Sequence, residues 1–145
     1  MNIRKAKEDD AEQIKELVSG LSHFYLSASE ESLPEWLLSS LELKEFKSRL
    51  KNNEFTNLVS ERNGSIIGYI SIKNKNYIYH LFVSQDHQRK GIAKKLWKKA
   101  KNLCQSSTYT VRSSLYAVPV YENFGFTKSK EIETKDNLQF QTMEL

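Results

Sequence analysis

Apolar residues recur at intervals of three and four in three parts of the chain, a spacing that places side chains on one face of a helix. Asp9 and Glu12, which resemble a helix-capping pair, precede the first part. Pro34 lies near the start of the second, where a break is expected around Ser39 and Ser40. The predicted helices cover residues 9–21, 32–50 and 92–104. The expected buried side of the second helix holds Trp36, Leu37, Leu41, Phe46 and Leu50.

Short apolar or alternating segments between these helices predict strands. Asn63-Gly64 favours a two-residue hairpin turn because both residues tolerate positive φ. Asn74-Lys75-Asn76 would form the next turn, so the strands around these turns form an antiparallel meander. Gly125 suits the end of a short helix over 117–124. The predicted strands are 2–7, 55–61, 66–73, 77–83, 109–113, 126–132 and 138–145, and residues 22–33 read as a mobile connection.

The turn before the last long helix reads Gln88-Arg89-Lys90-Gly91-Ile92-Ala93. A helix N-terminus leaves backbone N–H groups without intrahelical partners and carries partial positive charge. A glycine in the turn lets an anion approach the backbone closely. The spacing matches neither GxGxxG nor GxxxxGK[ST], so neither of those phosphate loops is indicated. The turn therefore predicts a phosphate-binding site of another kind.

The bulk composition narrows the class of protein. The chain has 145 residues, 39% hydrophobic and 28% charged, which predicts one globular domain over residues 1–145. It has no apolar run of about 20 residues and no signal-peptide core, so we expect a cytoplasmic protein without a membrane partner. Cys104 is the single cysteine and the three histidines are scattered, so neither a disulfide nor a metal site is expected.

Positive charge is concentrated beside the glycine turn. Residues 87–101 carry seven Lys and Arg and no acid, so with a net charge of +4 the rest of the chain sums to −3. A local basic patch on a nearly neutral body suits a small polyanionic ligand, and nucleic acid is the rival partner. Against nucleic acid, the basic stretch lacks interleaved aromatic residues beyond Trp97, which belongs to the apolar face of the helix.

Two segments resemble the GNAT superfamily, the acyl-CoA-dependent N-acyltransferases. Residues 88–93 resemble its Q/R-x-x-G-x-G/A signature, and residues 113–126, SSLYAVPVYENFGF, resemble its A-x-x-x-Y-x-x-x-G-F segment. The predicted order, β-α-α-β-β-β-α-β-α-β-β, is that of the GNAT fold, an α+β fold with a central mixed sheet flanked by helices. The resemblance covers nearly the whole chain and is specific over about residues 77–126.

The resemblance implies acetyl-CoA as cosubstrate, with the turn amides gripping its pyrophosphate. It also implies that the strand before the turn splays from its parallel neighbour at a bulge and offers its backbone to the pantetheine arm. Many relatives carry Asn where this chain has Arg112, so this position departs from the pattern of the family. The implied cofactor contacts are Leu81, Phe82, Val83, Gln88, Arg89, Lys90, Gly91, Ile92, Ala93, Lys94, Ala117, Asn123 and Phe124.

The resemblance also implies catalytic residues. Tyr121 would be the general acid, because a phenol, with a reference pKa of about 10, keeps its proton at neutral pH and can pass it to a departing thiolate. The glutamate that many relatives use as base is absent from residues 77–83. Tyr77, Tyr79 and His80 are the candidates there, beside a water relay, and strand alternation would put Tyr79 and His80 on opposite faces. The expected acceptor side is lined by His23, Tyr25 and Glu35.

These observations predict an N-acetyltransferase that moves an acetyl group from acetyl-CoA to a primary amine by direct attack. The acceptor would be a small molecule or a protein amine, and the chain would act as a monomer or homodimer. The alternative is a CoA-binding regulatory or sensor module that kept the cofactor grip and lost the acceptor chemistry. The missing glutamate keeps that alternative open.

Overall fold

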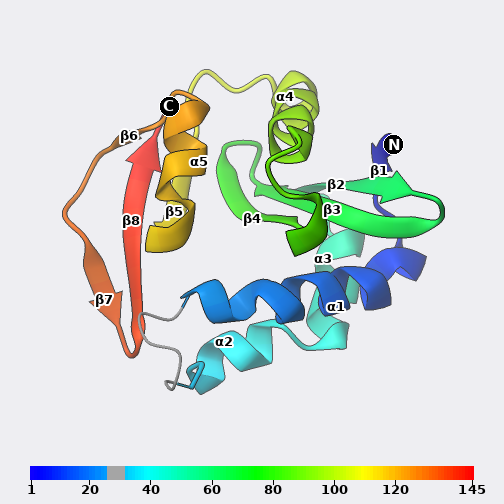
Figure 1. Ribbon diagram of the computed structural model, residues 1–145, viewed down its shortest axis with the longest axis horizontal. Coiled ribbons are helices and arrows are strands. Elements are labelled where there is room, and N and C mark those ends of the chain that lie inside the picture. The colour runs from blue at the N-terminus through cyan, green and yellow to red at the C-terminus, as the bar shows by residue number, and fades with distance from the viewer. Residues whose placement is uncertain (26–31) are drawn as a thin grey trace.

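Helices cover both faces of one mixed sheet in the computed structural model, which describes residues 1–25 and 32–145 (Figure 1). The strand order is β1-β2-β3-β4-β5-β8-β6, with β7 paired to β8. The described strands are β1 Asn2–Lys5, β2 Phe55–Arg62, β3 Ser65–Lys73, β4 Tyr77–Val83, β5 Thr110–Ser114, β6 Thr127–Lys128, β7 Glu133–Lys135 and β8 Leu138–Glu144. The described α-helices are α1 Ala11–Leu21, α2 Glu35–Ser40, α3 Leu43–Lys51, α4 Ile92–Cys104 and α5 Val118–Asn123.

The sheet is antiparallel except at its centre, where β4 and β5 run parallel. A parallel pair needs a crossover connection, and α4 supplies it between these two strands. β4 and β5 are joined by two residue pairs alone, Tyr77 with Thr110 and Ile78 with Val111. Beyond Ile78 and Val111 the two strands separate. The expected α+β fold with a mixed central sheet is thus confirmed.

Two hydrophobic clusters lie on opposite faces of the sheet. We call the face covered by α4 and α5 the upper face and the face covered by α1 and α3 the lower face (Figure 1). Ile70 and Ile72 of β3 point to the upper cluster with Leu96, whereas Tyr69 joins Phe46 below. This alternation follows from the two-residue period of a strand. The residues on the two faces of β3 therefore anchor both helical layers.

Four sequence-based expectations need correction or refinement. The second predicted helix is divided, as expected, into α2 and α3, but Trp36 is 41% exposed because it turns toward β7 rather than the core. Leu103, expected on the apolar face of α4, is 47% exposed. The first strand ends at Lys5. Of the strand predicted over 126–132, only β6 forms; a second short strand, β7, begins directly after that range, and both pair with β8.

The connection expected over residues 22–33 is described only in part. Residues 22–25 form a short 3-10 turn after α1, and residues 26–31 lie outside the described chain.

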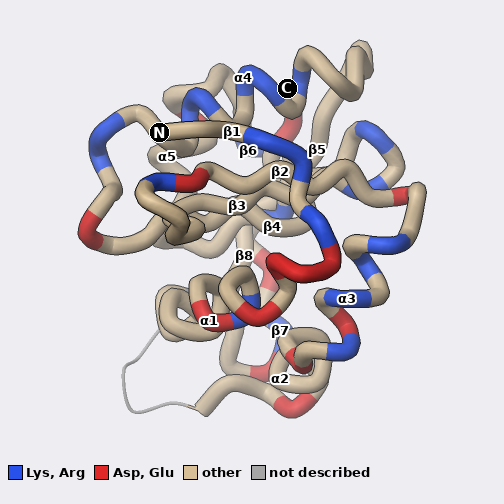
Figure 2. Tube along the Cα trace, turned by 90° about the vertical axis from the view of Figure 1, so that its right-hand side faces the viewer, with Lys and Arg blue, Asp and Glu red and all other residues tan. Residues whose placement is uncertain are grey.

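Figure 2 shows the Lys and Arg residues of α4 at one end of the molecule and acidic residues on α1 at the other. No helix among the described residues is long and apolar enough to cross a membrane.

Candidate functional site

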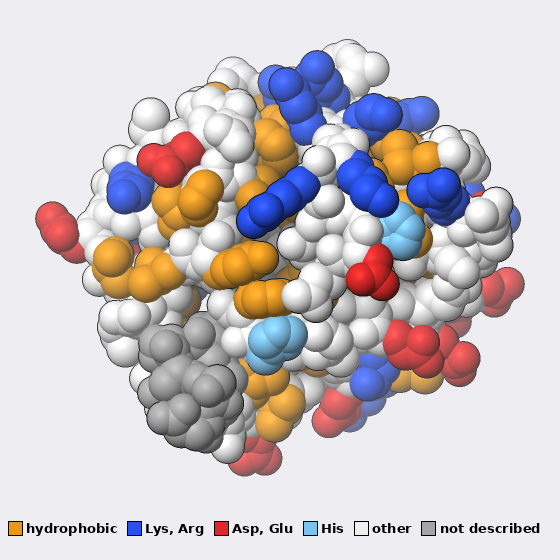
Figure 3. Space-filling view, in the orientation of Figure 1, with side chains coloured by type: hydrophobic (Ala, Val, Ile, Leu, Met, Phe, Trp, Pro, Cys, Tyr) orange, Lys and Arg blue, Asp and Glu red, His pale blue; other side chains and the backbone are white. Residues whose placement is uncertain are grey.

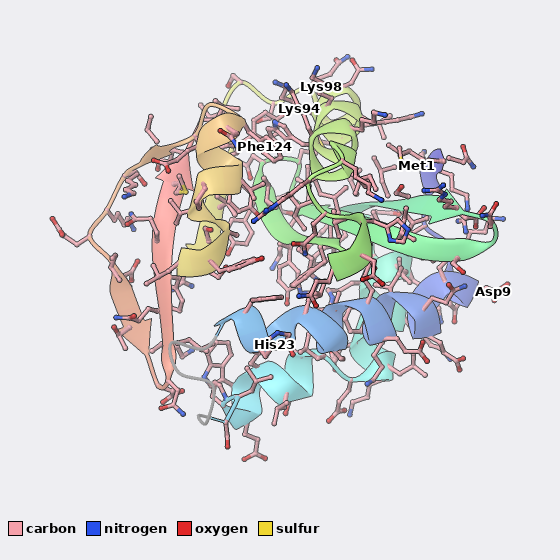
Figure 4. The ribbon with its side chains drawn as sticks, viewed as in Figure 1. Met1, Asp9, His23, Lys94, Lys98 and Phe124 are labelled. Carbon is pink, nitrogen blue, oxygen red and sulfur yellow. The ribbon has the colours of Figure 1, made fainter. Side chains whose placement is uncertain are left out.

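A cleft of about 780 Å³ opens where β4 and β5 separate. Its walls come from β4, the turn before α4, the first turn of α4, β5 and α5. Hydrophobic side chains gather in the middle of the face shown in Figure 3, with Lys and Arg above them. In Figure 4, Lys94 and Phe124 lie toward the top of this face, and His23 lies below them at the end of α1. The cleft thus connects the glycine turn with the sheet centre.

A one-residue bulge in β4 accompanies the separation of the strands. Ser71 of β3 pairs with His80, and the next residue, Ile72, pairs with Ile78, so Tyr79 is the extra residue. A bulge bends its strand and increases its local twist. It lies directly beyond Ile78, the last β4 residue paired with β5. The edges of β4 and β5 that face the cleft consequently do not pair with each other.

The glycine turn presents free backbone donors to one end of the cleft. Gly91 caps α4 with φ +80°, and Arg89 also has a positive φ of 64°. The backbone N–H groups of Gly91, Ile92 and Ala93 have no acceptor within the described chain. A Cβ atom added at Gly91 would meet no atom within 4 Å. The turn therefore has the open, amide-rich surface that an anion requires.

A side-chain hydrogen bond joins the glycine turn to β4, the strand that precedes it. Gln88 donates a hydrogen bond from Nε2 to the carbonyl oxygen of Val83, over 3.0 Å. Tyr116, at the start of the α5 segment, reaches Gln88 Oε1 from the other wall at 3.5 Å. Tyr116 also stacks on Phe24 with ring centroids 4.2 Å apart. These contacts link the end of α1, the turn and the α5 wall around the cleft.

Tyr121 enters the cleft from the short helix α5. Pro119 lies in the first turn of this helix, and Gly125, with φ +99°, ends it. The backbone N–H of Phe126 donates to the carbonyl of Tyr121 at 3.0 Å, which closes the helix end. The Tyr121 ring packs edge-on against Phe124 and Phe126 and is 5% exposed. Packing therefore restricts the position of this phenol.

Tyr79 and His80 lie on the same face of the sheet, so the expectation that alternation separates them is wrong. The bulge interrupts the two-residue period at Tyr79, and both rings turn to the lower face, with centroids 4.7 Å apart. Arg49 of α3 lies over the Tyr79 ring, 5.2 Å from its centroid. His80 stacks on Phe46 of the same helix at 5.8 Å. Sequence alone could not show this, because a bulge has no fixed sequence signal.

His80 is 7% exposed, and its Nδ1 has no hydrogen-bond partner within the described residues. Burial, assisted by the positive charge of Arg49, lowers the pKa of His80 from its ordinary value to about 3. The imidazole is therefore neutral at physiological pH, but it is a weak proton acceptor. This environment argues against His80 as the general base, a role that stays a prediction.

The buried state of His80 predicts a pH-dependent stability. Unfolding returns its pKa to about 6.5, so below that pH the unfolded chain binds a proton that the folded chain does not. The free energy of unfolding should fall as pH falls from 6.5 toward 3. Between pH 6.5 and 5.5 the free energy of unfolding of the wild-type chain should fall by about 1 kcal/mol more than that of His80→Gln. Urea unfolding at the two pH values measures this difference.

His23→Gln is the matched control, because His23 is exposed at the end of α1. Its pH slope should equal that of the wild type. An NMR titration of the wild-type imidazoles gives a second measurement that does not depend on a variant. Equal slopes in the wild type and His80→Gln, or a His80 resonance that titrates near pH 6.5, would show that His80 protonates in the folded chain.

The described lining of the cleft is cationic. It contains Arg89, Lys94 and Arg112 and no Asp or Glu. Arg89 and Lys94 belong to the glycine-turn end, whereas Arg112 follows Val111, the last β5 residue paired with β4. The cleft therefore has positive charge at two separate places.

The structure brings most of the predicted site residues together. Tyr79, His80, Tyr121 and every predicted cofactor contact except Lys90 line the cleft. His23 and Glu35 do not line it, and the side chain of Tyr25 lies outside the described part. Sequence reasoning missed Phe24 and Tyr116, although Tyr116 lies within the second motif. Nothing in the pattern of residues 22–25 indicated that Phe24 would line the cleft.

The chain is similar to known acetyltransferases. A family model described as an acetyltransferase (GNAT) domain matches residues 25–145. An uncharacterized N-acetyltransferase, YhfO of Bacillus subtilis (strain 168), is 33% identical over 111 residues, which cover 70% of this chain and 69% of that protein.

Solved structures share the fold. PaiA N-acetyltransferase from Thermoplasma acidophilum, in complex with coenzyme A, matches with a TM-score of 0.82 at 18% identity, over 99% of this chain and 96% of that one. The ribosomal-protein-S18-alanine N-acetyltransferase from Escherichia coli matches with a TM-score of 0.71 at 18% identity, over 99% and 92% of the two chains. At such identities the likeness concerns the arrangement of helices and strands.

Proposed function

The chain belongs to the GNAT acetyltransferase family and is thus an acyltransferase, and on that premise we propose that it transfers an acetyl group from acetyl-CoA to a primary amine by direct attack. The observation that carries the proposal is the separation of β4 from β5 beyond Ile78 and Val111. It leaves unpaired strand edges beside a cleft that runs between the glycine turn and Tyr121. Such an edge can pair with an extended arm, as in strand addition.

The residues around the glycine turn fit coenzyme A. The free N–H groups of Gly91, Ile92 and Ala93 would hold its diphosphate, with Arg89 and Lys94 supplying positive charge. The backbone of Leu81–Val83 would hold the pantetheine arm. When bound, acetyl-CoA supplies a thioester carbonyl that an amine can attack. The side chains of Gln88, Ala117, Asn123 and Phe124 would close the walls around it.

We assign the general-acid role to Tyr121. Its position in the cleft and its tight packing support a fixed proton donor. As the carbon–sulfur bond breaks, the phenol would give its proton to the sulfur that leaves. Cys104, the single cysteine, is buried at the C-terminal end of α4 and does not line the cleft. Direct attack therefore fits the chain better than a cysteine-bound acyl intermediate.

The positive charge of the cleft would favour the neutral form of the acceptor amine, so that no strong protein base is needed. A nearby positive charge disfavours a second one, so the cationic lining lowers the pKa of an ammonium group that enters. A larger share of the acceptor is then neutral and nucleophilic. Because His80 is a weak proton acceptor, we propose that water, rather than His80, takes the proton.

A panel of primary amines screened for thiol release from acetyl-CoA tests the proposal. We expect at least one amine class to release thiol well above the amine-free rate, with equal amounts of acetylated amine by mass spectrometry. Acetyl-CoA binding without transfer to any amine would instead favour a CoA-binding regulatory module. Failure to bind acetyl-CoA at all would contradict both functions.

A further inference from the structure

Arg112 holds a guanidinium group at the end of the cleft away from the glycine turn. It follows Val111 in β5, and strand alternation places it on the lower face with Thr110 and Tyr77. Its Cζ lies 4.3 Å from the centroid of the Phe140 ring. Burial raises the pKa of Tyr77, and the positive charge of Arg112 acts against that rise.

The guanidinium has no anionic partner in the described chain. No described Asp or Glu lies within ion-pair distance of it, and no described residue accepts a hydrogen bond from it. By contrast, Arg4 of β1 binds Asp10 and Glu61 at 2.8 Å each. Stacking on Phe140 limits the freedom of Arg112 while leaving its N–H donors available. Arg112 is exposed, and its stacking on Phe140 holds the guanidinium at the cleft for an anion that the described residues do not supply.

The cleft around Arg112 is poorly suited to a polycation. Its described lining carries three positive side chains and no carboxylate. A diamine or polyamine would bring a second positive charge beside Arg112, and no carboxylate of the described lining would balance it. An acceptor that carries an anionic group beside its amine would balance the charge of Arg112. A planar guanidinium forms bidentate hydrogen bonds with a carboxylate or a phosphate.

We propose that Arg112 binds an anionic group, a carboxylate or phosphate, on the acceptor amine, so that the preferred acceptors are amino-acid-like rather than plain amines. This inference rests on the proposed acetyl transfer at the same cleft. Arg112 lies on the lower face with Tyr77, whereas Lys94 lies on α4, which covers the upper face. The acceptor would therefore meet Arg112 from the side opposite α4.

Matched acceptor pairs that differ by the anionic group test this inference. The pairs are histidine with histamine, phenylalanine with phenethylamine, and lysine with cadaverine; phosphoethanolamine with ethanolamine forms the phosphate arm. We expect wild-type kcat/KM to favour the anionic member of at least one pair by about 10-fold or more, the size of a charged hydrogen bond. A preference in the three carboxylate pairs would identify a carboxylate as the anion, and a preference in the phosphoethanolamine pair would identify a phosphate.

Arg112→Gln should reduce that preference to less than about 3-fold through a higher acceptor KM, with the KM for acetyl-CoA unchanged. Arg112→Lys should restore part of it, because a lysine keeps the charge without the planar fork. Arg62→Gln is the matched control, since Arg62 is an exposed arginine at the end of β2 and outside the cleft. It should keep the full preference.

Three outcomes would overturn the inference: equal or better turnover of plain amines, an unchanged preference in Arg112→Gln, or a rise in KM for acetyl-CoA alone. If no amine is acetylated, the proposed function fails separately. Calorimetric titration of the same amino acids into the CoA-loaded chain then decides the anion site on its own. Binding that Arg112→Gln abolishes supports the site, and an absence of binding contradicts it.

Discussion

We expect Gly91→Gln to abolish the rise in melting temperature that acetyl-CoA should cause in the wild-type chain. The added side chain would project into the open space beside the free N–H groups, where the diphosphate is proposed to lie. At a concentration of about 100 Kd, mass action stabilises the folded chain by roughly 2.7 kcal/mol. For a chain of this size that corresponds to about 5–10 °C. Thermal unfolding with and without acetyl-CoA measures the effect.

Gly64→Gln is a closely matched control. Gly64 has φ +81°, against +80° at Gly91, and an added Cβ atom would likewise meet nothing within 4 Å. It lies in the β2–β3 hairpin turn, outside the cleft. Both variants should lose about 1–2 kcal/mol of stability from a side chain at positive φ, but Gly64→Gln should keep the acetyl-CoA shift. A full shift in Gly91→Gln would refute the phosphate site.

We expect Tyr121→Phe to lower kcat by about 100-fold or more and to leave the affinity for acetyl-CoA within about 3-fold of wild type. The estimate follows from the usual contribution of a general acid. Phenylalanine keeps the ring that packs against Phe124 and Phe126, so the walls of the cleft should remain in place. Steady-state kinetics with a saturating acceptor, together with a direct measurement of acetyl-CoA binding, separate the two effects.

Tyr109→Phe controls for the loss of a buried hydroxyl. Tyr109 belongs to the same core cluster as Tyr121 and does not line the cleft. Its hydroxyl accepts a hydrogen bond from the Ser106 N–H at 3.0 Å, so its removal should cost about 1 kcal/mol of stability. Turnover should stay at the wild-type level. Normal kcat in Tyr121→Phe, or a loss of kcat as large in Tyr109→Phe, would remove Tyr121 from the proposed role.

The two tests address different steps of the proposed reaction. Gly91 concerns the hold on the diphosphate, and Tyr121 concerns proton transfer at the thioester sulfur. A chain that loses the first property should lose both binding and turnover, whereas one that loses the second should still bind. The Arg112 variants then report on the acceptor side, so the three sets of measurements locate a defect in the cofactor, the chemistry or the acceptor.

The sequence by itself determined the order of helices and strands, the glycine turn and the two family motifs. These features are local. The apolar faces of α1 and α4 follow the helical period, Asn63-Gly64 forms its hairpin, and Gly125 ends α5 as expected. In each case, neighbouring residues contain the whole physical cause, either a repeating period or a residue that tolerates positive φ.

Tertiary structure alone determined the surroundings of the side chains that line the cleft. The bulge at Tyr79 depends on the register between β4 and β3, and it places His80 beside Phe46 of α3 in a buried environment. Arg112 acquires its stacking partner from β8, about thirty residues further along the chain. Periodicity predicts the face of a side chain only while the ladder stays regular. Where a ladder shifts, contacts between distant segments determine the burial, pKa and charge on which function depends.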